Sequence, residues 1–315
     1  MPSFTWVAAA NMIELCNARP VFVDIDLNTF NISIDKIERA ITHLTKAILP
    51  VSLFGLSADM DSISNIAKKH KLFVIEDDAC ALGAYYHGVH AGRFADLACF
   101  SFHPRKAITT GEGGMIITDT DQIAEKIISL RNHGASSSKS GIHSSEFDFL
   151  LPDFDLSGFN YRMTDIQAAL GNAQIARLRW ILKQRSYFAN KYRAELNGLE
   201  WLTLPHCPEN YQHGYQSFVI LFTPVIPSLK NIEELNKNRN LFMEKMKQAG
   251  IMTRPGTHAV HMLGYYRKKY KIKPNDYINS YFADQLSIAL PLYPQMTDDE
   301  FNYIITSIRK IGKNF

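Results

Sequence analysis

One lysine, Lys106, lies between an apolar segment and a glycine-rich turn. Residues 95–102 are mostly apolar and predict a strand, and the turn at 111–114 opens a second predicted strand at 114–118. A lysine held at the end of a buried strand is poorly solvated, which favours its neutral amine. A neutral amine can attack a carbonyl carbon. Most lysines are solvated surface charges, but the apolar residues before Lys106 and the glycines after it favour a chemical role.

Two carboxylates follow another predicted strand. Residues 72–76 form an apolar run that ends in an acid, and Asp77 and Asp78 come directly after it. Because parallel strands of α/β folds end at the ligand crevice, we expect one of these side chains to point into a site. A carboxylate there can keep a pyridine nitrogen protonated, so that pyridoxal phosphate accepts electrons. Alone, an acidic strand end is more simply a cap for the next turn; the presence of Lys106 favours the cofactor interpretation.

The motifs around these residues resemble, in type and order, those of the DegT/StrS-type sugar aminotransferases. The similar segments cover nearly the whole chain: residues 2–6, 20–26, 76–84, 101–114, 158–170 and 289–294. The resemblance implies an α/β fold, that of the pyridoxal-phosphate-dependent transferases of fold type I. It implies a large cofactor-binding domain with a mostly parallel sheet at 1–185 and a smaller C-terminal α+β domain at 186–315.

The resemblance implies a transamination in which Lys106 binds pyridoxal 5′-phosphate covalently and then moves the proton of the amino donor. Asp77 pairs with the pyridine nitrogen. It matches the family motif better than Asp78, which stands where the family usually has a small residue. The implied donor is glutamate or glutamine, and the implied acceptor is a nucleotide-linked keto-deoxy sugar used for surface polysaccharide or a glycosylated product. Lys106 distinguishes the chain from related sugar dehydratases, which carry histidine at this position.

Further cofactor contacts are implied at four positions. Trp6 matches the aromatic residue that stacks on the cofactor ring, with a core tryptophan as the alternative. Ser101 matches a phosphate contact, and Asn160 matches a residue that reaches the phosphate of the neighbouring subunit in a homodimer. Cys80 stands where the family usually has Gln or His against the ring. Because a thiol hydrogen-bonds weakly, we expect Cys80 to orient the cofactor less firmly than those residues do.

Substrate contacts are implied for three residues. His258 and His261 match a loop near the sugar nucleotide, and Arg162 could serve an anion, with a structural salt bridge nearly as consistent. No carboxylate or cysteine cluster accompanies the two histidines, so the sequence predicts no metal site. His103 recurs in the motif that contains Lys106 and is expected to shape its loop.

The resemblance also sets an expectation about the N-terminus. Relatives carry several dozen more residues before the segment similar to 2–6. Those residues include a Ser-Gly-Thr turn at a helix N-terminus, which binds the cofactor phosphate. The large domain is therefore expected to be incomplete, through a start codon assigned too late or through a genuine truncation. The alternative function is a non-catalytic fragment of such an enzyme, one that pairs with an intact paralogue.

The composition is that of an ordinary globular protein. The chain has 315 residues, 46% of them hydrophobic, and a net charge of +3 from 34 basic and 31 acidic residues. This balance argues against a nucleic-acid partner, and no apolar run is long enough to cross a membrane. The cysteines have no metal-ligand spacing and are expected to be free thiols in a reducing cytoplasm; they are Cys16, Cys80, Cys99 and Cys207.

The elements that must position these residues alternate in the first half. We expect helices at 34–43, 60–70 and 121–132 and strands at 19–26, 47–54, 72–76, 95–102 and 114–118. This alternation indicates a mostly parallel sheet with helices on both faces. Helical spacing from Thr164 to Leu196 predicts one long helix joining the domains.

Three elements are expected after this helix: a strand at 215–222, a helix at 232–249 and a closing helix after Thr297. The polar, Ser-rich stretch 134–155 predicts a loop, which either covers the site or is an idle surface insertion.

Overall fold

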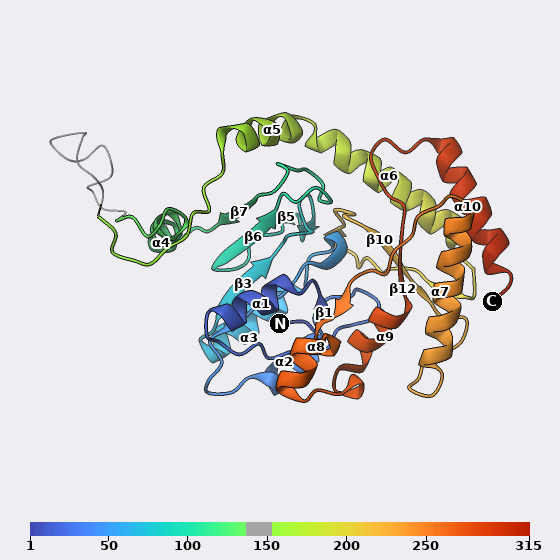
Figure 1. Cartoon of the computed structure of the whole chain (residues 1–315), viewed down its shortest axis with the longest axis horizontal. Helices are drawn as coiled ribbons and strands as arrows, with labels where there is room; N and C mark the ends of the chain where they lie inside the picture. The colour runs from blue at the N-terminus through green and yellow to red at the C-terminus, as the bar shows by residue number, and fades with distance from the viewer. Residues whose placement is uncertain (137–152) are drawn as a thin grey trace.

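A four-stranded sheet forms the centre of the N-terminal half. The computed structural model describes residues 1–136 and 153–315 of the chain. Strands β2 (Ala47–Ile48), β3 (Phe73–Asp77) and β6 (Leu97–Ser101) run parallel. The fourth strand, β7 (Gly114–Ile117), pairs antiparallel with β6 at the edge of the sheet. This sheet confirms the α/β class expected from the sequence, and Figure 1 shows β3, β6 and β7 side by side.

The helices of this half are α1 (Ala8–Leu15), α2 (Ile34–Ala40), α3 (Met60–His70) and α4 (Asp121–Arg131). The bounds of α3 agree with the prediction, and its ends have clear causes. Asp59 caps the first turn by accepting the N–H of Ser62 at 3.1 Å. Lys71, with a φ of 55°, ends the helix in the left-handed region. The buried face of α3 packs in one core with Ile48 and Val74 of the sheet.

A second sheet lies in the C-terminal half, with the antiparallel order β12-β10-β8. Its strands are β8 (Leu202–Thr203), β10 (Phe218–Phe222) and β12 (Ser287–Leu290). Helices α6 (Leu178–Leu196), α7 (Ile232–Gln248) and α10 (Asp298–Gly312) contribute to the same core. All five residues of β10 are buried, because aromatic side chains cover the sheet; Tyr192, Phe242 and Phe301 are among them. In Figure 1, α7 and α10 lie beside this sheet.

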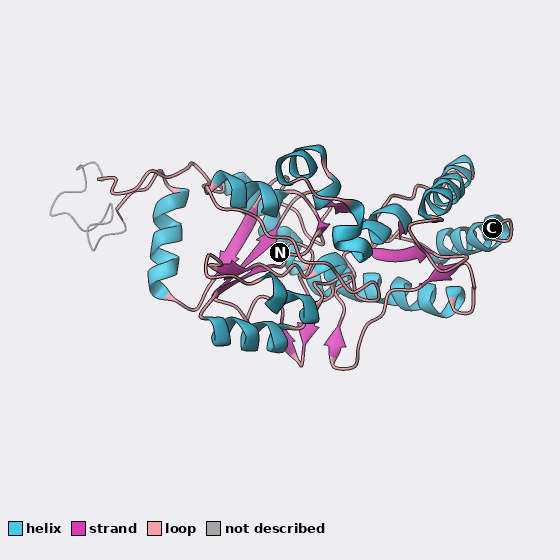
Figure 2. Ribbon diagram, turned by 90° about the horizontal axis from the view of Figure 1, so that it is seen from below, coloured by secondary structure: helices cyan, strands magenta, loops and turns pink. Residues whose placement is uncertain are grey.

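Short elements tie distant parts of the chain together. Strand β1 (Phe4–Thr5) pairs antiparallel with β11 (His258–Ala259), so the N-terminus lies against the C-terminal half. A three-stranded sheet joins β4 (Tyr85–Tyr86) to β5 (Val89–His90) and β9 (Tyr211–Gln212). The remaining helices are α8 (Gly264–Tyr270) and α9 (Ile278–Leu286), and short 3-10 turns lie at Leu53–Gly55, Val260–Met262 and Pro274–Tyr277. Figure 2 shows the N-terminus near the middle of the molecule and the C-terminus at one end.

The long helix predicted from Thr164 to Leu196 is two helices in the structure. The first, α5 (Asp165–Ala176), starts with a capping box formed by Thr164 and Gln167, and α6 follows directly. At Arg177 ψ is −4°, far from the helical value near −42°, so the hydrogen-bonded ladder breaks there. The boundary expected after residue 185 falls inside α6 and stays a prediction.

Two predicted strands are shorter than expected. The segment 19–26 forms single bridges, one between Val23 and Pro2 and one between Ile25 and Ile32. The segment 47–54 pairs at Ala47–Ile48 and again at Val51, since Pro50 lacks an N–H and interrupts the ladder. The later strand starts at Phe218 and not at 215. A φ of 45° at Tyr215 is incompatible with an extended strand.

Most of the loop expected at 134–155 lies outside the described residues. None of the helices described at 1–136 and 153–315 is long and apolar enough to span a membrane.

Candidate functional site

Lys106 lies in the loop that connects β6 to β7. The loop is held at both sides: the N–H of Lys106 donates to the carbonyl of His103 at 2.9 Å, and that of Thr110 donates to Phe102 at 3.1 Å. Buried Phe102 and Ile108 anchor it against the core. The loop therefore holds the half-buried Lys106 side chain beside the ends of β3 and β6.

Cys80 is the direct neighbour of the lysine amine. The Nζ atom of Lys106 lies 3.1 Å from the Sγ atom of Cys80, at hydrogen-bonding distance for sulfur. No ion pair between Lys106 and a carboxylate is found within residues 1–136 and 153–315. An amine that is next to a thiol and not locked to a carboxylate stays available to a carbonyl carbon.

Asp77 is the last residue of β3. One of its oxygens accepts the N–H of Ala79 at 3.1 Å. Burial raises the pKa of Asp77, while the Ala79 N–H and the charge of Lys106 act in the opposite direction. A cationic ring nitrogen placed at this carboxylate would be stabilised by it.

Asp78 and Glu76 occupy the other face of the strand end, since side chains alternate along a strand. Both are completely buried. Glu76 accepts N–H bonds from Gly92 at 3.0 Å and from Phe94 at 3.4 Å, whereas neither oxygen of Asp78 has a hydrogen-bond partner among residues 1–136 and 153–315. Burial, and then the neighbouring Glu76 carboxylate, raise the pKa of Asp78 well above its ordinary value. Asp77 is only partly buried whereas Asp78 is completely buried, which favours Asp77 as the carboxylate that faces a ligand.

Trp6, which directly follows β1, lies beside His258 of β11. Thr5 pairs with His258 across β1 and β11, and the rings of Trp6 and His258 are 5.7 Å apart. The guanidinium of Arg105 lies 5.9 Å from the Trp6 ring. Trp6 is 55% exposed, so it is not the core tryptophan given as the alternative. An exposed indole face offers a flat apolar surface for a ring.

His261 has a different environment from His258. It is completely buried, and its Nδ1 shares a hydrogen bond of 2.6 Å with the Oγ of Ser3. Burial lowers the pKa of His261 to about 4, so it is neutral at physiological pH. A sugar-nucleotide contact by His261 would require this packing to open. His258 is the exposed member of the pair, and a substrate contact by His261 stays a prediction.

Three expected site residues have partners other than Lys106. The Oγ of Ser101, at the end of β6, accepts the N–H of His103 at 3.3 Å. Asn160 forms a single bridge with Asn132, and Arg162 donates to the Asn132 side chain at 2.6 Å. Arg162 thus forms a hydrogen bond and no salt bridge within the described parts of the chain. A role for Asn160 in a neighbouring subunit stays a prediction.

The structure adds two residues to the site that the motifs did not indicate. Gln216 donates its side-chain amide to the carbonyl of Arg105, which fixes the backbone beside Lys106. Arg105 itself adjoins the lysine and reaches the Trp6 ring. Gln216 is 111 residues away in the chain, so no local pattern indicates it. For Arg105 the sequence did hold a signal, since a basic residue directly before Lys106 could have been expected to lie near the site.

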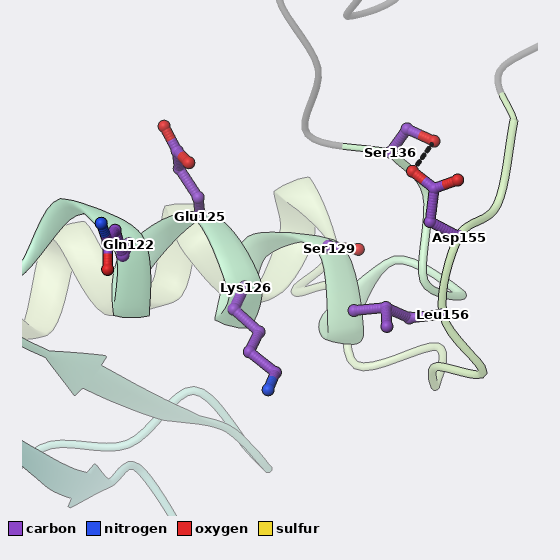
Figure 3. A pocket seen from close by; sticks show the side chains of 7 residues that line it. All are labelled: Gln122, Glu125, Lys126, Ser129, Ser136, Asp155 and Leu156. Carbon is purple, nitrogen blue, oxygen red and sulfur yellow. Dashed lines mark hydrogen bonds between the residues drawn. The ribbon is translucent and has the colours of Figure 1, made fainter.

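Surface hollows lie elsewhere. One, of about 240 Å³, lies beside α4, and there Ser136 donates to Asp155 at 2.8 Å (Figure 3). It adjoins the segment outside the described residues, and no expected site residue lines it. A second hollow, of about 480 Å³, is lined by Asp26, Asp59 and Tyr211 among others, again without an expected site residue. In the described ranges, 1–136 and 153–315, no cluster of three or more metal-ligating side chains occurs.

Known proteins share this arrangement over most of their length. The chain is 40% identical over 308 residues to MJ1066 of Methanocaldococcus jannaschii, covering 98% of this chain and 78% of that protein. PseC of Helicobacter pylori, an aminotransferase involved in the biosynthesis of pseudoaminic acid, is similar with a TM-score of 0.89 at 26% identity. The comparison covers 100% of this chain and 79% of PseC. The pyridoxal-phosphate form of Spr1654 from Streptococcus pneumoniae gives a TM-score of 0.88 at 26% identity, over 99% and 80% of the two chains.

A family model matches residues 1–309, which include every residue of the candidate site. One of these relatives, Spr1654, is known in a form with pyridoxal phosphate. A lysine amine and a carboxylate, such as those of Lys106 and Asp77, are the groups that this cofactor requires. The resemblance seen in the sequence is thereby confirmed. The chain belongs to the DegT/DnrJ/EryC1/StrS aminotransferase family, a family of pyridoxal-phosphate-dependent sugar aminotransferases.

Proposed function

We propose that this chain transfers an amino group from glutamate or glutamine to a nucleotide-linked keto-deoxy sugar, with pyridoxal 5′-phosphate as cofactor. The observation that carries the proposal is the position of the Lys106 amine. It lies 3.1 Å from the thiol of Cys80 and next to Asp77, at the ends of two parallel strands. Support for a sugar acceptor comes from the relatives, among them PseC, which takes part in the biosynthesis of pseudoaminic acid.

The residues present fit the cofactor in type. Lys106 offers an amine for its carbonyl carbon, Asp77 a carboxylate for its ring nitrogen, and Trp6 an exposed face for its ring. Ser101 and Cys80 would contact its phosphate and its ring edge. When bound, pyridoxal phosphate supplies a ring that takes up the electron pair released at the α-carbon of the donor.

The protein contributes proton transfer and charge. With the cofactor bound, the Lys106 amine would move the α-proton of the donor to the cofactor, as base and then as acid, and would move a proton the opposite way to the acceptor in the second half-reaction. Asp77 would favour a protonated ring nitrogen. Burial already disfavours an isolated charge on Asp77, so a cationic partner has a large effect on this carboxyl. The thiol of Cys80 positions Nζ but is too weak a hydrogen-bonding group to hold it firmly.

The proposal includes a homodimer in which Asn160 serves the neighbouring site. Asn160 and Arg162 are exposed, and the rings of Phe159 and Tyr161 stack at 4.9 Å on the surface. An exposed aromatic pair of this kind is typical of an interaction surface. The side chain of Gln167 donates to the carbonyl of Glu112 at 2.9 Å, which keeps this surface close to the loop that carries Lys106.

The first test is the visible absorbance of the purified chain with added pyridoxal phosphate. We expect a band in the parent that is absent in Lys106→Ala and is bleached by glutamate or glutamine. Borohydride reduction followed by peptide mass spectrometry should place the cofactor on Lys106. A folded parent protein with no band and no labelled lysine would contradict the proposal. It would support a non-catalytic fragment, which mixing with an intact homologue would test further.

A further inference from the structure

Arg105 is a basic residue whose side chain the proposed transamination does not use. We propose that Arg105 binds an oxyanion of the substrate beside Lys106, either the carboxylate of the amino donor or a phosphate of the nucleotide sugar. This inference rests on the proposed function, because Lys106 defines where the reacting groups must lie. It adds a binding residue that determines which anionic substrates the site accepts.

The backbone of Arg105 is fixed while its side chain is not. The N–H of Arg105 donates to the ring of His103 at 3.2 Å, and its carbonyl accepts from Gln216. Within residues 1–136 and 153–315, its guanidinium forms no ion pair and no side-chain hydrogen bond. The backbone of Arg105 is held by hydrogen bonds, while the N–H donors of its planar guanidinium are free to bind. Such an arginine is suited to bind a carboxylate or phosphate in a bidentate manner.

The guanidinium of Arg105 lies 5.9 Å from the centroid of the Trp6 ring. This is the outer limit of a cation–π contact, so the contact orients the side chain without holding it. Trp6 in turn lies against exposed His258. Three segments far apart in the chain therefore meet beside Lys106, and each presents an exposed side chain.

The local charge also favours an anion. Arg105 and Lys106 are adjacent cations. The charge of Lys106 acts on buried Asp77, and the acid–base contact within the loop joins His103 to Glu112 at 3.8 Å. Glu112 is exposed, so solvent screens its charge. An exposed cation such as Arg105, next to an aromatic face, attracts oxyanions and raises their local concentration.

The test measures anion binding without the cofactor, so that it does not depend on catalysis. The probes are inorganic pyrophosphate, for the phosphate source, and glutarate, for the carboxylate source. Binding is followed by calorimetry and by tryptophan fluorescence. The variants are Arg105→Met, which keeps an apolar stem, and Arg105→Lys, which keeps the charge. The matched control is Arg177→Met, because Arg177 is also exposed and lies 5.1 Å from the ring of Trp180.

We expect the parent to bind one of the probes and Arg105→Met to bind it at least about tenfold more weakly, with Arg105→Lys in between and Arg177→Met unchanged. Preference for pyrophosphate identifies the nucleotide sugar as the source of the anion, and preference for glutarate identifies the donor. Equal binding by the parent and Arg105→Met, or no binding by the parent, would overturn the inference. Arg105-dependent binding in a chain that forms no lysine-bound cofactor would instead overturn the proposed function and leave the anion site standing.

Discussion

At the scale of single residues, the site places the Lys106 amine against the thiol of Cys80. A thiol 3.1 Å from the lysine amine is a weaker hydrogen-bonding group than an amide or imidazole. Replacing Cys80 by Gln supplies a stronger group at the position that faces the cofactor ring. We expect Cys80→Gln to tighten the binding of pyridoxal phosphate about two- to tenfold, the range of one added hydrogen bond. Equilibrium dialysis of the cofactor measures this.

Cys16→Gln is the matched control, because Cys16 is an exposed cysteine at the C-terminal end of α1. It should leave the cofactor affinity unchanged. If Cys80→Gln weakened the binding, the thiol would be the better fit, and the hydrogen-bonding argument would be wrong.

Asp78 predicts a pH dependence of stability. Its pKa is raised by burial and then by Glu76, with Asp77 adding a smaller effect in the same direction. A carboxyl with a raised folded pKa stabilises the fold fully below its unfolded pKa of about 4 and loses that stabilisation as the pH rises through the folded pKa. Asp78→Asn should therefore raise the free energy of unfolding at pH 7 to 8 relative to the parent, and the difference should shrink as the pH falls towards 4.

Urea denaturation across this pH range measures the effect. Asp155→Asn is a suitable control, since Asp155 is an exposed carboxyl whose replacement removes no buried charge. Parallel curves for the parent and Asp78→Asn at every pH would show that Asp78 is not the titrating group.

At the scale of elements, two helices start with the same capping box but differ in packing. Thr297 accepts the N–H of Glu300 at 3.2 Å in α10, and Thr164 accepts that of Gln167 at 3.3 Å in α5. Helix α10 buries a full apolar face, whereas α5 buries only Gly171. Thr297→Ala should lower the free energy of unfolding by about 1 kcal/mol.

Thr164→Ala is the comparison. It should change global unfolding little and speed amide hydrogen exchange in the first turn of α5, because this helix frays without unfolding the core. Equal losses of global stability in both variants would mean that α5 is part of the cooperative core.

The same elements show what the sequence can and cannot predict. The helix at 60–70 was predictable to the residue, since its apolar spacing and the Asp59 cap are local. The break at Arg177 was not, because the apolar spacing continues through it. In the site, Lys106, Asp77 and Trp6 were indicated by motifs. Gln216 was not, since tertiary packing alone brings it to the Lys106 loop.

At the scale of the whole molecule, large apolar side chains are exposed at several places in the described residues, and two such groups adjoin the loop that carries Lys106. One lies on and before α5, where Ile166 is 84% and Tyr161 is 69% exposed. The other is on the edge strand β7, where Met115 is 51% and Ile116 is 46% exposed. Single exposed apolar residues are ordinary, but groups of them favour a protein partner. The proposed homodimer would cover the group on α5, which lies against the loop that carries Lys106.

Ile166→Glu tests whether a second copy covers this surface. Residue 166 lies in the first turn of α5, where an acidic side chain interacts favourably with the helix dipole, so the helix should form as before. In a dimer the new carboxylate would be buried without a partner, which should raise the dissociation constant at least about tenfold. Sedimentation of the parent and variant over a range of concentrations measures this.

Leu241→Glu on α7, at a residue 47% exposed, is the matched control and should dimerise as the parent does. A parent that sediments as a monomer at all concentrations, or a variant that dimerises as the parent does, would remove α5 from the interface, and the proposed role of Asn160 across subunits would fall with it.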